Sequence, residues 1–131
     1  MTSPDADTGP ENPIVRMFTW WNRAFGEVDG FTPQAFADHY TSDGELVVNG
    51  NLRGRGPEAL ARHYRNLQDS FDTIRMVLPV IDDFSCTDRA FVQCVTEAVR
   101  DGKTIREEAM AAATIRDGRI AHLKVIGRST D

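Results

Sequence analysis

Lys124 and His122 are the residues of this sequence whose types and spacing point most directly to chemistry. They stand two positions apart on an expected strand, so both side chains leave the same face of the sheet. A lysine that faces a protein interior loses hydration, which lowers its pKa and makes it a base or an imine-forming nucleophile, and a histidine there can act as a general base. Asn49, at the end of an earlier strand, can hold a substrate carbonyl. Structural alternatives stay open: Lys124 reaching solvent at a rim, His122 as a core histidine with one hydrogen bond, and Asn49 as part of an Asn-Gly turn.

Two Asp-Gly dipeptides, at 101–102 and 117–118, determine which side chains share that face. Asp-Gly between alternating segments strongly favours a two-residue hairpin turn. We therefore expect three consecutive strands over residues 89–100, 103–116 and 119–128. This register puts Lys124 inward, opposite Ala111. The same face is expected to carry Val92, Cys94, Thr96, Ala98, Ile105, Glu107, Ala109, Ala111, Ala113, Ile115, Ile120, His122, Lys124 and Ile126.

The elements before these strands are predicted to be mainly helical. Asn12-Pro13 is an N-cap followed by a first-turn proline, and an apolar stripe at three- and four-residue spacing follows it. Two further helices are expected from Pro33 to about Tyr40 and from Pro57 to Phe71. A strand is expected over 45–49, a Gly- and Arg-rich loop over 50–56, and a segment bent at Pro79 over 73–84. We expect residues 1–11 to be a disordered tail and residues 12–131 to be one domain.

Composition excludes several classes of protein. The net charge is −5 and there is no basic block, which argues against a nucleic-acid partner. No apolar run is long enough for a membrane span, and the acidic N-terminal segment does not resemble a signal peptide, so a cytoplasmic location is expected. Cys86 and Cys94 are expected to be free thiols in a reducing compartment. The three histidines lie on different elements, so we expect no metal site. No other cofactor is expected.

The order of elements and four short motifs resemble the nuclear-transport-factor-2-like superfamily. The motifs are Glu27–Phe31, Phe36–Asp38, Gly56 before the third helix, and Arg116–Ile120. The superfamily includes SnoaL-like and ketosteroid-isomerase-like proteins of the cystatin-like α+β fold. The resemblance implies a curved, mostly antiparallel sheet that forms a conical barrel closed by three N-terminal helices around a deep apolar pocket. It also implies a homodimer through the outer sheet face.

Most catalytic residues of ketosteroid isomerase have no equivalent at the corresponding positions of this sequence. That enzyme is a well-known example of carboxyl groups whose pKa values are shifted by their surroundings. Its aspartate base corresponds to Asn49, an amide that cannot accept the proton. Its oxyanion-hole tyrosine falls at Phe18 or Thr19, and its protonated aspartate at Ala111. A further tyrosine of that hydrogen-bond network does match Tyr64.

Two other enzyme types of this scaffold also match incompletely. His122 lies one residue from the histidine of SnoaL-type cyclases, but no inward aspartate accompanies it. Limonene epoxide hydrolase is similar in scaffold and has an Arg-x-Asp and a second aspartate, where this chain has Val95-x-Glu97 and Lys124. Neither mechanism transfers as it stands.

The sequence supports two functions of different class. The first is a cofactor-independent isomerase, cyclase or dehydratase that acts on an apolar or polycyclic carbonyl compound, with Lys124, His122 and Asn49 as its polar groups. The second is a non-catalytic ligand-binding or dimeric assembly module of the same fold, and an accessory subunit of a larger enzyme is also possible. In either case the expected ligand-lining residues are Phe18, Trp21, Phe36, Tyr40, Tyr64, Thr96, Ala109, Ala111 and Ala113.

Overall fold

The computed structural model describes residues 11–129, which form three helices and seven strands. The predicted tail falls almost entirely on residues 1–10 and so lies outside the described residues. None of the described helices is long and apolar enough to span a membrane. In chain order the elements are α1 (Pro13–Phe25), α2 (Pro33–Ala37), β1 (Tyr40–Val48), β2 (Asn51–Arg55), α3 (Pro57–Ser70), β3 (Thr73–Met76), β4 (Asp82–Ser85), β5 (Arg89–Arg100), β6 (Lys103–Arg116) and β7 (Arg119–Ser129).

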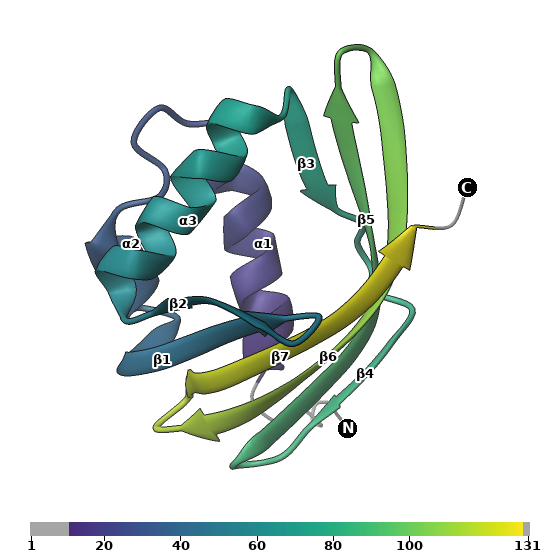
Figure 1. The fold of residues 1–131 in the computed structure, drawn as a ribbon. Coiled ribbons are helices and arrows are strands. Elements are labelled where there is room, and N and C mark those ends of the chain that lie inside the picture. Colours follow the sequence, from purple (N-terminus) through teal and green to yellow (C-terminus); the bar gives the residue numbers. More distant parts are fainter. Residues whose placement is uncertain (1–10, 130–131) are drawn as a thin grey trace, which may run out of the picture.

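A single strongly curved sheet holds the molecule together. Its strand order is β2-β1-β7-β6-β5-β3, and β4 pairs with β5 beyond the end of β3. β1 and β7 run parallel, whereas every other pair is antiparallel. Figure 1 shows α1 and α3 lying in the hollow of this sheet, which curls around them as a half-barrel. The expected α+β architecture is confirmed.

The hairpin between β5 and β6 has the predicted register along its whole length. Arg100 pairs with Lys103, and the pairing continues without a shift to Arg89 and Thr114. Asp101 and Gly102 form the turn with φ angles of 54° and 77°, the left-handed conformation that a tight hairpin turn requires. The inward residues of these two strands were therefore assigned correctly from the sequence.

The hairpin between β6 and β7 departs from the predicted register after two pairs. Ile115 pairs with Ile120 as expected, but the register then shifts and Thr114 pairs with His122. Because side chains alternate along a strand, one extra residue moves all the following side chains to the opposite face. Ala111 consequently faces Val125, and Lys124 faces Ala112. The expected inward positions of His122, Lys124 and Ile126 are wrong.

Several further elements differ from the sequence prediction. The second helix ends at Ala37 rather than near Tyr40, and β1 begins at Tyr40 rather than at residue 45. Residues 50–56 were expected to be a loop, yet they contain β2, which pairs with β1 across a turn at Asn49 and Gly50. Asn-Gly is a strong hairpin signal, and it outweighs the low strand propensity of the glycines and arginines that follow. The segment over 73–84 is broken rather than simply bent: β3 and β4 are separated by a stretch that contains the cis bond before Pro79.

Side-chain amides fix the helices against the sheet. Asn12 accepts a hydrogen bond from Ile14 N (2.9 Å) and donates to the carbonyls of Phe84 and Phe91, which anchors the start of α1. Asn22 bonds both backbone groups of Met76, at 2.8 and 2.9 Å, and so ties the middle of α1 to β3. These bonds set the position of the α1 face that turns toward the sheet.

An aromatic cluster joins the three helices to one another. Its members are Trp20, Trp21, Phe25, Phe31, Phe36, Tyr40 and Tyr64, with neighbouring ring centroids 4.9–6.2 Å apart. Such pairs add to the stability that area burial alone supplies. The cluster closes one end of the half-barrel and leaves the other end less filled.

The sharp turn after α1 depends on Gly30, where an added Cβ would lie 1.9 Å from the Ala24 carbonyl oxygen. We expect Gly30→Ala to lower the free energy of unfolding by about 3 kcal/mol, because backbone atoms must move to admit the methyl group. Urea denaturation measures the change. Gly26→Ala is the matched control: its Cβ would meet only ordinary contacts in a helical conformation, so its effect should stay below about 1 kcal/mol. Equal effects at both positions would contradict the packing described.

Candidate functional site

The largest of three hollows in the described part of the chain is a cavity of about 550 Å³ between α1, α3 and the concave face of the sheet. Two smaller hollows, of about 320 and 470 Å³, lie elsewhere on the molecule. Sites for small apolar ligands are concave, mostly apolar and carry few polar groups, and the 550 Å³ hollow has the most apolar walls of the three. It is therefore the candidate site.

Small side chains on β6 create this space. Ala109 and Ala111 stand opposite Cys94 and Val92 on β5, and opposite Gly127 and Val125 on β7. Three neighbouring strands thus carry short side chains in the middle of the sheet, and the helices do not fill the volume that remains. A closed hydrophobic core would need larger residues at these positions.

Most of the predicted ligand-lining residues do line the cavity. Phe18 and Trp21 come from α1 and Tyr64 from α3, while Thr96, Ala109 and Ala111 come from the sheet. The other three lie in the core away from the cavity wall: Phe36, Tyr40 and Ala113, each at most 3% exposed. The sequence therefore predicted the correct face of the sheet for the cavity wall. It also assigned to that wall residues that lie in the core, two of which belong to the aromatic cluster.

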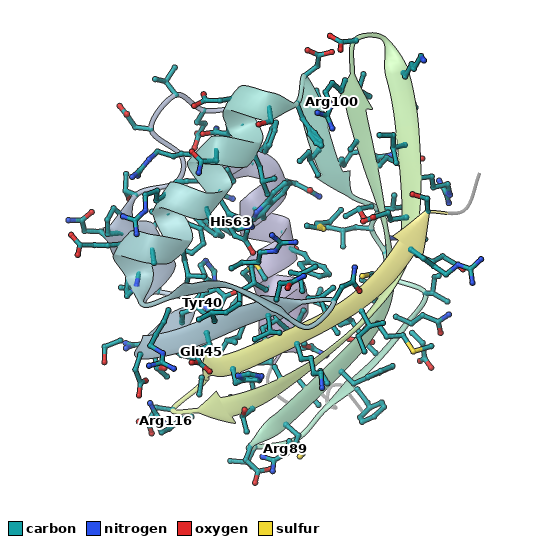
Figure 2. The ribbon with its side chains drawn as sticks, in the orientation of Figure 1. Tyr40, Glu45, His63, Arg89, Arg100 and Arg116 are labelled. Atoms are coloured by element: carbon teal, nitrogen blue, oxygen red, sulfur yellow. The ribbon has the colours of Figure 1, made fainter. Side chains whose placement is uncertain are left out.

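His63 is the ionisable ring on the helical wall of the cavity. It lies on α3, half-buried, with its ring centroid 5.2 Å from that of Tyr64. Figure 2 shows it below α3, on the side that faces the sheet. Burial lowers the pKa of His63, and the positive charge of Arg53 lowers it further. The imidazole is therefore neutral at pH 7 and able to accept a proton.

Tyr64 adds a hydrogen-bond donor beside this base. Burial raises the pKa of Tyr64 to about 12, so its hydroxyl stays protonated. The nearby Tyr40 hydroxyl lowers the pKa of Tyr64 by a smaller amount than burial raises it. The Tyr40 hydroxyl does not meet the distance and angle criteria for a hydrogen bond to any described residue. The indole Nε1 of Trp21 is also buried without a partner among residues 11–129. Because this nitrogen has almost no accessible surface, it is not a donor to a ligand in the cavity.

The mouth of the cavity carries polar groups of a different kind. Asn49 and Arg53 lie on the hairpin of β1 and β2, while Glu107 lies on β6 and Ser129 at the end of β7; all four are exposed. Asn49 has the turn role that the sequence analysis left open, and its side chain also lines the cavity. It forms the turn with a φ of 49°, and its side-chain oxygen accepts a hydrogen bond from Gly127 N (3.0 Å) at the cavity edge.

His122 and Lys124 lie on the outer face of the sheet. The Nδ1 atom of His122 is 3.1 Å from Glu45, and 40% of its side chain is exposed. Hydrogen bonds from Arg55 and from His122 hold the pKa of Glu45 below its ordinary value. Lys124 is exposed beside Ala112 and does not line the cavity. These two side chains are therefore separated from the cavity by the sheet itself.

Sequence reasoning missed His63 and Arg53 as cavity residues. For His63 a signal was present, because it stands three positions after Leu60 and four before Leu67, and so shares their side of the helix. Arg53 carried no such signal. It is the extra residue of a β-bulge in β2, because Leu46 pairs with Gly54 and Val47 with Leu52, and periodicity does not predict a bulge.

We expect the His63 ring to titrate below the ordinary histidine value of about 6.5 when followed by NMR. Arg53→Gln should move this pKa upward, because it removes a positive charge that disfavours the imidazolium. Arg55→Gln removes the same charge from the same strand but on the side of Glu45, and should leave the pKa of His63 unchanged. An ordinary pKa in the unmodified protein would contradict the burial of the ring.

Comparisons with solved structures show the same fold. An NTF2-like protein of unknown function from Exiguobacterium sp. 255-15 aligns with a TM-score of 0.73 and 16% identity, covering 90% of this chain and 99% of its own. A candidate SnoaL-like polyketide cyclase from Jannaschia sp. CCS1 aligns with a TM-score of 0.71 and 15% identity, covering 92% and 90%. A protein with a ketosteroid isomerase-like fold from Catenulispora acidiphila, solved with trimethylamine, gives 0.68 and 16%, covering 90% and 85%.

Sequence comparison identifies the family. A search of curated proteins finds no match to this sequence. The sequence profile of the SnoaL-like domain, however, matches residues 14–123, which span all three helices and most of the sheet. The expected resemblance is thereby confirmed, and the chain belongs to the family of SnoaL-like domains.

Proposed function

We propose that this protein is a cofactor-independent enzyme that moves a proton next to the carbonyl group of a small apolar compound bound in the 550 Å³ cavity. One observation supports this most strongly: a neutral imidazole and a protonated phenol lie side by side on the wall of a mostly apolar cavity. His63 replaces Lys124 and His122 as the candidate base.

The chemistry begins with His63 accepting a proton from a carbon next to the carbonyl. The electron pair of that C–H bond forms a C=C bond, and the carbonyl oxygen gains the negative charge. Tyr64, on the same wall, donates a hydrogen bond to this oxygen. The imidazolium then returns its proton to another carbon of a conjugated substrate, which completes an isomerisation without any cofactor.

The same intermediate leads to ring closure in a substrate with a second carbonyl. The enolate carbon attacks that carbonyl carbon, one C–C bond forms, and the imidazolium protonates the new alkoxide. The cavity favours such a reaction because apolar walls exclude water and hold a folded substrate. The candidate polyketide cyclase from Jannaschia sp. CCS1 shares the fold and is consistent with this reaction class.

A non-catalytic binding protein is the second candidate. The scarcity of acidic groups in the cavity favours this candidate. Among the described residues that line the cavity, the one carboxylate is Glu107, which is exposed at the mouth. Without a carboxylate at the deep wall, catalysis depends on His63 alone as the base. A protein that only binds would need the donors but no base.

Deuterium exchange distinguishes the two candidates without knowledge of the natural substrate. Aromatic and polycyclic ketones are incubated with the protein in D₂O, and deuterium uptake next to the carbonyl is followed by mass spectrometry. We expect catalysed uptake that is reduced by about 10²- to 10⁴-fold in His63→Gln. Because the base must be neutral, the rate should rise with pH through the lowered pKa of His63 and level off near neutrality.

His122→Gln is the matched control, because it removes an imidazole from the outer face. It should leave the exchange rate within about twofold of the unmodified protein. Binding of a ketone without exchange would favour the non-catalytic candidate. Equal losses in both histidine variants would contradict the assignment of the base.

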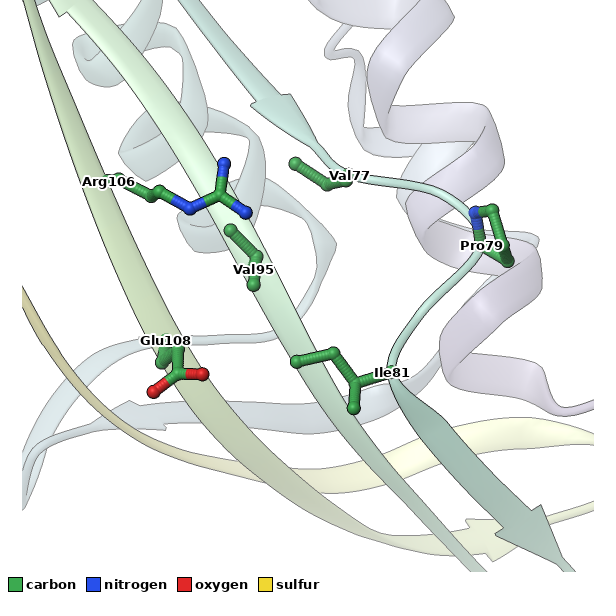
Figure 3. A pocket seen from close by; sticks show the side chains of 6 residues that line it. All are labelled: Val77, Pro79, Ile81, Val95, Arg106 and Glu108. Atoms are coloured by element: carbon green, nitrogen blue, oxygen red, sulfur yellow. The ribbon is translucent and has the colours of Figure 1, made fainter. Parts of the chain in front are cut away.

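We also propose that the protein is a homodimer joined through the outer face of the sheet. Phe84, Met110 and Ile126, which lie on β4, β6 and β7, are 66, 52 and 60% exposed. Apolar side chains gathered on one face of a sheet indicate an interaction surface. Figure 3 shows a hollow on this side, where Val77, Pro79 and Ile81 lie near Val95 of β5 and Arg106 and Glu108 of β6. Charges of both signs on one face suit a second copy of the same face.

Met110→Glu should shift the protein from dimer to monomer, because two copies of the carboxylate would meet in an apolar interface. Sedimentation equilibrium measures the change in mass. Val28→Glu is the control: Val28 is 94% exposed in the turn after α1, so its replacement should leave the mass unchanged. A monomeric unmodified protein would overturn the dimer proposal and would leave the cavity proposal intact.

A further inference from the structure

The mouth of the cavity has an unpaired positive charge at one corner. Arg53 lines the cavity and makes no ion pair or hydrogen bond with any residue in the range 11–129. Arg55, two positions along the same strand, is bound instead to Glu45 on the outer face. The guanidinium of Arg53 is therefore available to a ligand, whereas that of Arg55 is not.

The β-bulge explains why Arg53 is available. Across it, Arg53 and Gly54 together oppose the single residue Leu46. Gly54 takes the position nearest α3, where an added Cβ would lie 3.2 Å from the backbone of Ala59. Because that position has no side chain, the extra residue of the bulge is the one that reaches the cavity. Bulges of this kind re-aim a side chain beside a binding site.

Asn49 supplies a second donor on the same hairpin. Its side-chain oxygen accepts a hydrogen bond from Gly127 N (3.0 Å), so the amide nitrogen remains to donate to another group. The amide nitrogen has no acceptor among the described residues. The hairpin thus presents a guanidinium and an amide N–H₂ group at the cavity mouth. The carboxylate of Glu107 stands on β6, a different strand that also borders the mouth.

We propose that Arg53 and Asn49 bind the carboxylate of the ligand, so that the preferred substrates are apolar carbonyl compounds that also carry an acidic group. The inference rests on the cavity being the ligand site proposed above. A guanidinium matches a carboxylate with two parallel hydrogen bonds and is weakly hydrated, so it suits the boundary between an apolar cavity and water. The apolar body of the ligand then extends inward toward Trp21 and Tyr64.

Carboxylate binding also affects the base. Arg53 disfavours the protonated form of His63, and a bound carboxylate offsets that charge. An acidic ligand should therefore make His63 a stronger base at the moment when the substrate occupies the cavity. A neutral ligand of the same shape should not have this effect. Binding and proton transfer are thus linked through one arginine.

A matched pair of probes tests the inference: 2-naphthoate, which carries a carboxylate, and 2-acetylnaphthalene, which is a neutral ketone of similar shape. Affinities are measured by isothermal titration calorimetry. We expect Arg53→Gln to weaken 2-naphthoate binding at least tenfold and to change 2-acetylnaphthalene binding less than twofold. Arg53→Lys should recover part of the loss, because it restores the charge without the paired hydrogen bonds.

Arg55→Gln is the control, since it makes the same change in net charge on the same strand. It should leave both affinities within twofold. As an independent readout, 2-naphthoate should raise the pKa of His63 measured by NMR, whereas 2-acetylnaphthalene should not. Equal weakening of both probes by Arg53→Gln, or an equal effect of Arg55→Gln on 2-naphthoate, would overturn the inference.

The possible failures can be told apart. If the ketone binds in the cavity and 2-naphthoate binds independently of Arg53, the carboxylate inference fails and the proposed function survives. If neither probe binds the unmodified protein, the cavity is not a ligand site of this kind, and both proposals fail. Thermal unfolding of each variant confirms that an affinity change is not a folding defect, and the exposed position of Arg53 makes such a defect unexpected.

Discussion

A one-residue shift between β6 and β7 decides which side chains face the cavity. With the shift, Leu123 and Val125 point inward and Lys124 points outward. Without it, an ammonium group and an imidazole would stand in the middle of an apolar sheet face. Burial of those groups without partners would cost several kcal/mol, whereas the observed register buries two aliphatic side chains. Hydrophobic burial therefore overrides the simple geometry of the turn.

The empty volume is a consequence of the same arrangement. Ala109 and Ala111 are short, and Val125 and Gly127 face them across the strand pair. The aromatic cluster fills the other end of the half-barrel, so the unfilled space remains next to α3. There the helix presents His63 and Tyr64, and the sheet presents almost no polar group at depth. The candidate base and its neighbouring hydroxyl thus come from α3, whereas the polar groups of the mouth come from the sheet.

The sequence predicted the fold more reliably than the site because the two depend on different signals. Capping residues and proline positions marked the helix starts at Pro13, Pro33 and Pro57, and all three were correct. The turn at 101–102 gave the register of β5 and β6 in full. Sites depend on single side-chain directions, and a bulge changes those directions without a strong local signature. The bulges opposite Leu46 and after Thr114 are the places where the site prediction failed.

The most direct test of the account is an NMR measurement of where a bound ketone lies. Nuclear Overhauser effects are recorded between 2-acetylnaphthalene and the methyl groups of the protein. The account predicts contacts with the methyl groups of Ala109 and Ala111, which line the cavity, and none with that of Ala112, which faces outward. Contacts with Ala112 and none with Ala111 would show that the ligand binds the opposite face, and would contradict the central claim.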